Sequence, residues 1–435
     1  MKRWIAMLSC ILFLFVFPAC AEPFAGYEVT RAREKQWAEG VTLRQIALKK
    51  ENPDSETPIR QRLLLFLVDP AQNSKLRPLN LLANHRVHSL QKPSITASAQ
   101  REGKLLFGVN GDFFDIISGG PLGFNMNDGR WLTSGEFPDA QALGFDNQGH
   151  PHIANPGLII TLSATRADED ILTNIPIDAL NQPRADIPAR LSAPENAYQA
   201  RQDNLLVLYT KDNGNYTYTP GGGYEVTFST EDVLLSDSEM TGTVISVHGS
   251  NTPSEKIGNF YKGARIKKKT AVLSATGDGV TALSLLKRGD RISIRCAVSK
   301  EWEDVVVSTG GGRPDAGPLL LRDGMPQPNA EWVDDYEYFY GRHARTAFGL
   351  LPDGSYFFLN VQQGTDADGM TIDELRDAVS TLGAHDALNL DGGPSAAILF
   401  SPGKRATSVT DFFGNIKERE TSVANTLVLI ESKSK

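Results

Sequence analysis

The sequence predicts an α+β fold, built mostly from antiparallel or mixed β-sheet with a few packed helices. Short apolar runs alternate with Asn–Gly and Asp–Gly turn signals along most of the chain, which is typical of hairpins. One clear helical pattern occurs late, between two strand-like runs. The 435 residues could form one large domain or two, and 40% hydrophobic with 22% charged residues is an ordinary globular balance.

Charge and cysteine usage exclude several classes of protein. The formal net charge of −8 argues against a nucleic-acid partner and against general attraction to anionic membranes. The three cysteines are Cys10, Cys20 and Cys296, and only Cys296 lies well inside the chain. A mature protein with one cysteine can form neither an intrachain disulfide nor a cysteine-based metal site. The sequence predicts no cofactor and no metal, and it leaves the oligomeric state open.

Residues 1–21 predict an export signal. Lys2 and Arg3 precede an apolar run over residues 4–17, and Ala19-Cys20-Ala21 provides a cleavage pattern before Glu22. Lipid anchoring at Cys20 fits less well, because Phe and Pro are poor residues at the preceding positions. We therefore expect a periplasmic or secreted protein with no stable membrane insertion after cleavage.

The remaining elements follow in chain order. Residues 22–57 are polar and predict a lead-in. Apolar runs predict strands at 63–68, 104–114, 205–210, 224–228 and 291–296. Turn signals at 127–129, 146–149, 212–214, 323–324 and 352–354 predict hairpins. The polar, irregular segments 165–202 and 247–268 predict loops or insertions.

A helix is predicted from Thr371 to Gly383. Thr371 followed three residues later by Glu374 forms a capping box, apolar residues follow at helical spacing, and Gly383 ends the pattern. Strand-like runs at 356–361 and 387–390 flank the helix, so a βαβ crossover, right-handed by the usual rule, is possible here.

Two strand ends carry polar residues with alternating spacing. Asn389 and Asp391 share one face of a strand that runs into Gly392 and Gly393, where no side chain shields the backbone N–H groups. Asn110 and Asp112 repeat the arrangement. A carboxylate beside an open loop suits a site for a sugar or a phosphate. A plain Asp–Gly turn is the alternative.

Taken in order, a set of polar motifs resembles the phosphodiester glycosidase family. The motifs are Asn110-Gly111-Asp112-Phe113-Phe114, Gly119-Gly120-Pro121-Leu122-Gly123, the segment 317–324, the segment 342–349, the segment 369–375 and the segment 387–395. The resemblance runs from about Leu63 to Leu429 and implies a catalytic domain over residues 58–432. This chain departs from the family pattern at Asp112, over residues 361–368 and at Gly392-Gly393-Pro394-Ser395-Ala396, and these changes flank the expected pocket.

The resemblance implies hydrolysis of the sugar–phosphate bond of a glycosyl phosphodiester, giving a free sugar and a phosphomonoester. It implies Asp112 and Asp391 as a carboxylate pair and Arg345 as a phosphate clamp, because a guanidinium can hold two phosphate oxygens. Further substrate-binding residues are expected nearby. They are Asn110, Gly120, Thr346, Glu374, Asn389, Gly392, Gly393 and Ser395.

Each of these residues also has a structural interpretation. The two aspartates could cap loops, Arg345 could be an ion-pair partner, and Glu374 is most simply the capping-box residue. His343 and His385 could be surface or core histidines. Asp366-Ala367-Asp368-Gly369 resembles half of a calcium loop but lacks the later ligands.

Two other functions remain open. The first is a glycosidase acting on ordinary glycosidic bonds of an exopolysaccharide, and the second is a non-catalytic cell-wall or polysaccharide-binding module with the same fold. The sequence does not identify the sugar, the linkage or the stereochemical outcome.

Overall fold

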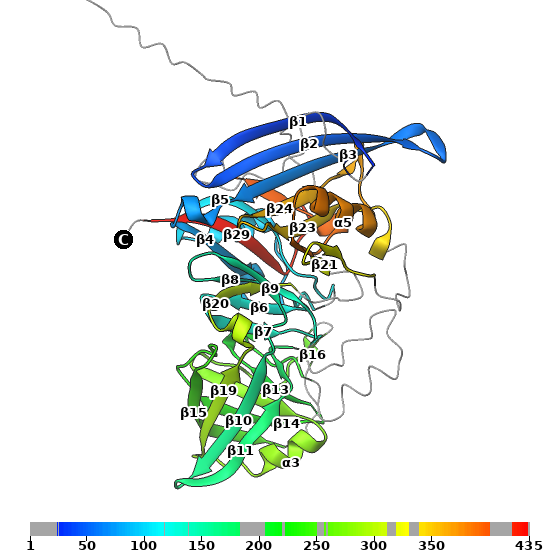
Figure 1. Cartoon of the computed structure of the whole chain (residues 1–435). Coiled ribbons are helices and arrows are strands. Elements are labelled where there is room, and N and C mark those ends of the chain that lie inside the picture. Colours follow the sequence, from blue (N-terminus) through cyan, green and yellow to red (C-terminus); the bar gives the residue numbers. More distant parts are fainter. Residues whose placement is uncertain are drawn as a thin grey trace, which may run out of the picture.

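The computed structural model describes residues 24, 26–116, 118–137, 139–182, 205–219, 222–249, 256–257, 260–310, 319–329, 339–400 and 420–433. Residues 1–21, the predicted export signal, lie outside this range. Figure 1 shows two sheet-rich bodies, an upper one with β1 to β3 and α5 and a lower one with β10 to β19, joined by strands around β6, β8 and β20. Strands dominate and helices are few, as the sequence predicts.

The upper body contains an eight-stranded sheet in the order β1-β2-β3-β24-β23-β27-β21-β22. All its neighbouring strands are antiparallel. The strands are β1 (Glu28–Ala38), β2 (Val41–Asn52), β3 (Ser55–Val68), β21 (Leu319–Arg322), β22 (Met325–Pro326), β23 (Arg345–Leu350), β24 (Tyr356–Val361) and β27 (Asp386–Asn389).

Residues 28–57 of the expected lead-in (22–57) belong almost entirely to this sheet. They form β1, β2 and the start of β3, and β2 pairs with β3 along its whole length. The polar composition is misleading because β1 is an edge strand exposed along most of its length. Charged side chains on such an edge protect it from pairing with another chain.

The predicted helix is α5 (Ile372–Thr381), and its capping box is present. It covers one face of the eight-stranded sheet with Ile372, Leu375, Ala378 and Val379. The helix connects β24 to β27, which run parallel because both pair antiparallel with β23 between them. The expected crossover therefore exists, but it spans one intervening strand.

A four-stranded sheet covers the opposite face, in the order β28-β5-β29-β4. Its strands are β4 (Leu76–Leu82), β5 (Gly103–Asn110), β28 (Ile398–Phe400) and β29 (Asn425–Ser432). Phe66 of β3 stacks on Phe107 of β5 at 4.2 Å between ring centroids. Because helix and sheet cover both faces, the run 63–68 is almost continuously apolar, which explains why it reads as a buried strand.

A five-stranded sheet, β7-β6-β20-β8-β9, joins the two bodies. Its strands are β6 (Phe124–Asn127), β7 (Arg130–Ser134), β8 (Ala142–Asp146), β9 (Pro151–Ala154) and β20 (Val305–Thr309). Leu143 and Phe145 of β8 pack in the upper core, whereas Ala142 of β8 and Val305 of β20 pack in the lower one, beside Trp302 of the 3-10 helix Lys300–Trp302 that precedes β20. The sheet therefore contributes to two hydrophobic cores at once.

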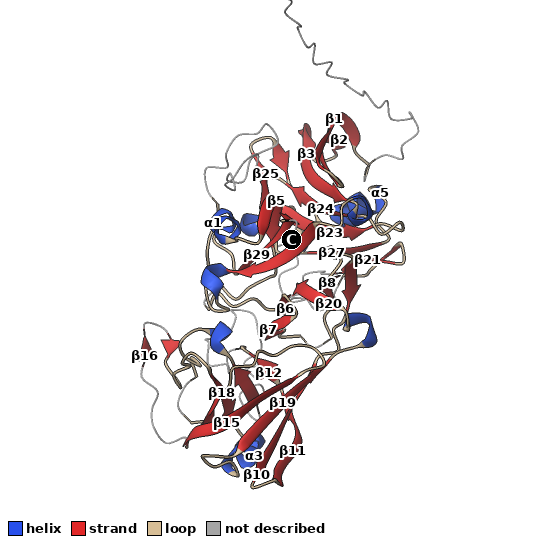
Figure 2. Cartoon of the chain, turned by 90° about the vertical axis from the view of Figure 1, so that its left-hand side faces the viewer, coloured by secondary structure: helices blue, strands red, loops and turns tan. Residues whose placement is uncertain are grey.

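The lower body has its own eight-stranded sheet, β11-β10-β19-β15-β14-β18-β13-β12, seen in Figure 2 below β6 and β7. Its strands are β10 (Ile159–Arg166), β11 (Glu169–Ile177), β12 (Ala179–Leu180), β13 (Leu206–Tyr209), β14 (Tyr224–Ser229), β15 (Glu239–His248), β18 (Thr270–Ala275) and β19 (Arg291–Ala297). Part of the segment predicted as a loop at 165–202 is thus the strand β11.

The remaining elements are short. They are α1 (Pro93–Ala99), α3 (Asp278–Ser284), and the small hairpins β16 (Lys256–Ile257) with β17 (Phe260–Tyr261) and β25 (Gln363–Gly364) with β26 (Ala367–Asp368). Four of the five predicted hairpin turns join paired strands, whereas 212–214 belongs to a 3-10 turn after β13. Cys296 is buried and free, as expected. No described helix is long and apolar enough to cross a membrane.

Candidate functional site

The predicted polar strand ends lie where three sheets meet. Asn110 ends β5 of the four-stranded sheet, and Asn389 ends β27 of the eight-stranded sheet. Asn125 lies in β6 of the five-stranded sheet and hydrogen-bonds to Asp112. A backbone hydrogen bond joins the segments that follow Asn110 and Asn389: the N–H of Asp391 donates to the carbonyl of Gly111 at 3.3 Å.

Asn110 connects the two aspartate-bearing segments. Its Nδ2 donates to the carbonyl of Asp391 at 2.6 Å, and its Oδ1 accepts from Oγ1 of Thr346 at 2.7 Å and from the N–H of Ala397 at 2.9 Å. Asn110 and Thr346 are fully buried. Both therefore hold the Asp391 loop in place, and their expected contact with substrate stays a prediction.

Asp391 follows β27 and is partly exposed. Its Oδ1 accepts from the N–H of Gly392 at 2.9 Å, and Ser395 also hydrogen-bonds to its side chain. Burial of the carboxyl group raises the pKa of Asp391 to about 7, against the lowering effect of these two hydrogen bonds. Asn389, two residues earlier in the chain, is buried on β27.

Asp112 is 1% exposed. Its Oδ2 accepts from the N–H of Gly123 at 2.6 Å and from Nδ2 of Asn125 at 2.9 Å. Its Oδ1 is buried and has no hydrogen-bond partner of good geometry among the residues that the structure describes. Burial, together with the charge of Asp391, raises the pKa of Asp112 to about 7, against the lowering effect of hydrogen bonds from Asn125, Gly123 and the backbone of Phe113. The two carboxyl groups are thus electrostatic neighbours, brought together from 279 residues apart in the chain (391 minus 112).

Sequence reasoning missed a cluster of buried asparagines behind Asp112. Asn80, Asn125 and Asn425 come from three different strands, β4, β6 and β29, and each is at most 1% exposed. They hydrogen-bond to one another over 2.8 to 3.0 Å. Asn125 also lies two residues after the Gly-Gly-Pro-Leu-Gly motif, and that proximity was the one available sequence signal.

The three glycines expected to offer backbone N–H groups use those groups within the protein. The N–H of Gly392 donates to Asp391, that of Gly393 to the carbonyl of Ala344 at 2.7 Å, and that of Gly120 to Oγ of Ser118 at 3.2 Å. The expectation that these amides stand open to a ligand is therefore corrected: in this structure each one shapes its own loop.

Arg345 is buried, and its guanidinium donates to main-chain carbonyls. Nε donates to Met370 at 3.0 Å, Nη1 to Phe339 at 3.1 Å and Nη2 to Gly341 at 2.6 Å. Burial lowers the pKa of Arg345 to about 10. The residue holds together the chain segments that precede β23 and α5. Its expected role as a phosphate clamp therefore stays a prediction, and a purely structural role is the alternative.

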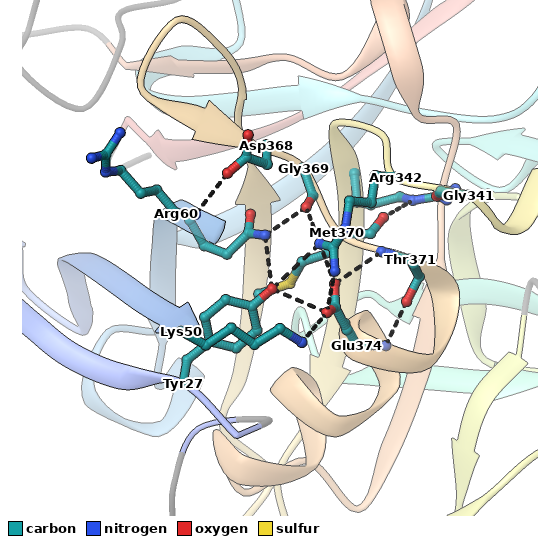
Figure 3. Close-up of polar contacts among 12 residues, drawn as sticks. Tyr27, Lys50, Arg60, Gly341, Arg342, Asp368, Gly369, Met370, Thr371 and Glu374 are labelled. Carbon is teal, nitrogen blue, oxygen red and sulfur yellow. Dashed lines mark hydrogen bonds and ion pairs between the residues drawn. The ribbon is translucent and has the colours of Figure 1, made fainter. Parts of the chain in front are cut away.

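Glu374 lies in a separate polar cluster, shown in Figure 3. It forms ion pairs with Arg342 at 2.6 Å and with Lys50 at 2.5 Å, and it accepts from the hydroxyl of Tyr27 at 3.0 Å. Burial raises the pKa of Glu374, but the hydrogen bonds from Arg342 and Lys50 outweigh burial and lower it overall. The cluster attaches the N-terminal strands to α5, and no described contact connects Glu374 with either site aspartate.

One group of described side chains has the composition of a metal site, namely Asp323, His385 and Asp386. It lies at the start of β27, whereas Asp391 follows the end of that strand. Hydrogen bonding within the protein accounts for it: Nδ1 of His385 lies 3.0 Å from Asp386, and Arg322 is 3.4 Å from the same carboxylate. The half calcium loop at 366–369 lies partly in the β25–β26 hairpin, where Asp368 accepts from the N–H of Arg60 at 2.7 Å.

Comparison with known proteins supports the family expected from the motifs. The phosphodiester glycosidase family matches residues 240–430, a segment that contains Asp391 and Arg345 but not Asp112. No curated protein matches the chain.

Solved structures resemble the fold. A hypothetical protein from Synechocystis is 16% identical with a TM-score of 0.65, and the match covers 92% of this chain and 64% of that one. A Burkholderia pseudomallei protein described provisionally as exported is 17% identical with a TM-score of 0.63, covering 93% and 97%. The catalytic domain of zebrafish N-acetylglucosamine-1-phosphodiester α-N-acetylglucosaminidase, auto-inhibited by its pro-peptide, is 13% identical with a TM-score of 0.42, covering 93% and 89%.

Proposed function

On the premise that residues 240–430 form a phosphodiester glycosidase domain, we propose that this protein is an exported hydrolase that cleaves the bond between a sugar and a phosphate. The observation that carries the proposal is the pair of neighbouring carboxyl groups at Asp112 and Asp391, both with a pKa raised to about 7. Perturbed carboxyl pairs of this kind cluster at catalytic sites, and glycoside hydrolysis needs two carboxyl groups.

The two groups suit different roles. Asp112 is fully buried and Asp391 is partly exposed, so a single negative charge is better solvated on Asp391. We therefore assign to Asp112 the one proton that the pair holds near neutral pH. The ionised Asp391 can attack the anomeric carbon or deprotonate a water molecule that does so.

The bond changes balance without a cofactor. Water supplies oxygen to the anomeric carbon, the carbon–oxygen bond to phosphate breaks, and the bonding electrons leave with the phosphate oxygen. Asp112 can give its proton to that oxygen, and the proton released from water then restores the protonated pair. The products are a free sugar and a phosphomonoester.

Hydrolysis of ordinary glycosidic bonds is the second candidate, and a specific observation favours it. The guanidinium of Arg345 and the N–H groups of Gly120, Gly392 and Gly393 already donate to protein acceptors. No cation among the described residues contributes to the pKa of either aspartate. The part of the site that the structure describes thus offers no free positive group that would favour a phosphate leaving group.

An assay with paired substrates tests both candidates. Sugar 1-phosphate diesters and aryl glycosides of the same sugars are incubated with the protein, and sugar and phosphomonoester are measured together. The proposal expects both products in equal amounts from the diester, and a loss of at least about 100-fold in Asp391→Asn. Cleavage of the aryl glycosides alone would establish the second candidate. If neither substrate is cleaved by wild-type protein, the enzymatic proposal is wrong.

A further inference from the structure

The carboxyl group of Asp112 closes a ring of hydrogen bonds that begins at its own backbone. The N–H of Asp112 donates to Oδ1 of Asn425 at 2.9 Å. Nδ2 of Asn425 donates to Oδ1 of Asn125 at 3.0 Å, and Nδ2 of Asn125 donates to Oδ2 of Asp112 at 2.9 Å. Asn125 of β6, Asn425 of β29 and Asp112, which follows the end of β5, thus form one continuous circuit.

The direction of this ring is determined by donor and acceptor chemistry. A backbone N–H can only donate, so Asn425 must present its oxygen to Asp112 and its NH2 group to Asn125. Asn125 must then accept with its oxygen, which leaves its own NH2 group facing Asp112. The orientation of both amides, and therefore the donor at Oδ2, follows from the peptide group of Asp112 itself.

A third asparagine supports the same orientation. Oδ1 of Asn80 accepts from Asn425 at 2.8 Å, and its Nδ2 donates to Oδ1 of Asn125 at 2.8 Å and to the carbonyl of Ser308 at 2.6 Å. All three side chains are buried, where a reversed amide would face donor to donor or acceptor to acceptor.

Close backbone packing fixes the ring in space. A Cβ added at Gly111 would lie 2.5 Å from Nδ2 of Asn425. One added at Gly123 would lie 2.0 Å from the carbonyl of Gly310 and 2.7 Å from Oδ2 of Asp112. These two positions require glycine because a side chain would occupy the space of the ring.

The ring makes the two oxygens of Asp112 unequal. Oδ2 receives two N–H donors, from Asn125 and Gly123, so a proton on Oδ2 would face those donors. Oδ1 has no hydrogen-bond partner of good geometry among the described residues, and only a weaker interaction, from the backbone N–H of Phe113, is added to the two donors at Oδ2. We propose that Asn125 and Asn425 are positioning residues that direct the exchangeable proton of Asp112 to Oδ1. This inference deepens the proposed function and rests on it for the use made of that proton.

Titration of the full-length protein tests the proposal without any substrate. The carboxyl 13C resonance of Asp112 is identified by its loss in Asp112→Asn, and its midpoint is followed with pH. Asn125→Ala removes a donor that stabilises the ionised form, so the midpoint should rise by about one pH unit. Asn425→Ala does not touch the carboxyl group, yet it should raise the midpoint too, by less than Asn125→Ala, because it removes one of the two donors, Asn425 and Asn80, that hold the amide oxygen of Asn125.

The double variant separates positioning from general damage. If Asn425 acts through Asn125, adding Asn425→Ala to Asn125→Ala should shift the midpoint no further. Asn73→Ala is the matched control, because Asn73 is buried and bonded to main chain elsewhere and should leave the midpoint unchanged. An unchanged midpoint in Asn125→Ala, or additive shifts in the double variant, would overturn the proposal.

Wild-type protein provides a second measurement if a variant fails to fold. The side-chain NH2 resonances of Asn125 should shift with pH with the same midpoint as the Asp112 carboxyl carbon, and independence of the two signals would refute the ring. Failure of the proposed function is distinguishable, because a protein that cleaves no glycoside can still show every one of these shifts.

In an active enzyme, the alkaline limb of the pH–rate profile should move to higher pH in Asn125→Ala, by the same amount as the titration midpoint of Asp112.

Discussion

At the residue scale, burial makes the Asp112–Asp391 pair costly to ionise. The pKa of Asp112 in the folded protein is about 7, above its ordinary value of 3.8, so the folded protein binds more protons than the unfolded chain between these values. The stability associated with this proton is therefore present at low pH and is lost as pH rises through about 7.

Because this stability is lost as pH rises, removing the carboxyl group of Asp112 should matter most at high pH. Asp112→Asn places an amide oxygen where Oδ2 accepts and removes the ionisable group, so it should become more stable relative to wild type as pH rises. The advantage should grow by roughly 2–3 kcal/mol between pH 5 and pH 8, while catalysis is lost. Urea unfolding at both pH values measures it, with exposed Asp54→Asn as the control. A pH-independent difference would contradict the raised pKa.

Arg345 allows a test between its two roles. The three guanidinium nitrogens of Arg345 donate to three different carbonyls, and a lysine ammonium cannot reach all three. Arg345→Lys should therefore lower the free energy of unfolding by roughly 2–4 kcal/mol. As a structural residue it should slow cleavage of phosphodiesters and of aryl glycosides by the same factor. Denaturant unfolding and parallel rates on both substrates measure these effects. A selective loss on phosphodiesters, in a variant of unchanged stability, would instead support the phosphate clamp.

At the element scale, the cluster around Glu374 attaches β1 and β2 to α5. Hydrogen bonds from Arg342 and Lys50 outweigh burial and hold the pKa of Glu374 below its ordinary value of 4.5, so the stability that Glu374 contributes is present above pH 4.5 and is lost as pH falls below it. Lys50 also lies 4.5 Å from the centre of the Tyr27 ring, so the same cation serves two partners.

Glu374→Gln should therefore destabilise the protein by roughly 2–3 kcal/mol at pH 7, because two cations lose their shared anion. The difference from wild type should shrink as pH falls below about 4.5. Glu34→Gln is the matched control, since its ion pair with Arg44 on the exposed β1–β2 hairpin should contribute less than about 1 kcal/mol. Thermal unfolding across pH measures both variants, and an equal effect at the two positions would show that the cluster does not attach the hairpin.

At the scale of the whole molecule, the five-stranded sheet belongs to two cores. Trp302 is fully buried in the lower core and Phe145 in the upper one. Trp302→Ala and Phe145→Ala should each cost roughly 3–5 kcal/mol. Because the sheet is shared, each variant should still unfold in one transition, measured both by circular dichroism and by fluorescence. Separate transitions for the two bodies would refute this coupling.

Export belongs to the same scale. Phe24 and Tyr27 are buried in the core beneath α5, so processing must leave them in place. Cleavage after Ala21 does so, and we predict a mature N-terminus at Glu22. Mass spectrometry of the exported protein tests this. A diacylglycerol adduct on Cys20, or retention of Met1, would contradict it.

The sequence by itself determined most local elements. The capping box of α5, the buried strand at 63–68 and most of the Asp–Gly and Asn–Gly hairpins could be predicted because each depends on residues adjacent in the chain. The motif order likewise indicated the family and the two aspartates. The exposed edge strand β1 could not be predicted, because it pairs on one side only and is exposed along most of its length. It therefore lacks the apolar pattern that a strand normally shows.

Only the tertiary structure decided what the polar residues do. Asp112 and Asp391 became electrostatic neighbours because β5 and β27 end at the same junction, and their raised pKa values depend on burial that no local pattern encodes. Arg345, Glu374 and the three glycines matched functional motifs, yet their donors and acceptors are used within the protein. Asn125 and Asn425 carried no motif, but three strands distant in sequence bring them into one ring behind Asp112, because a hydrogen bond requires proximity in space rather than along the chain.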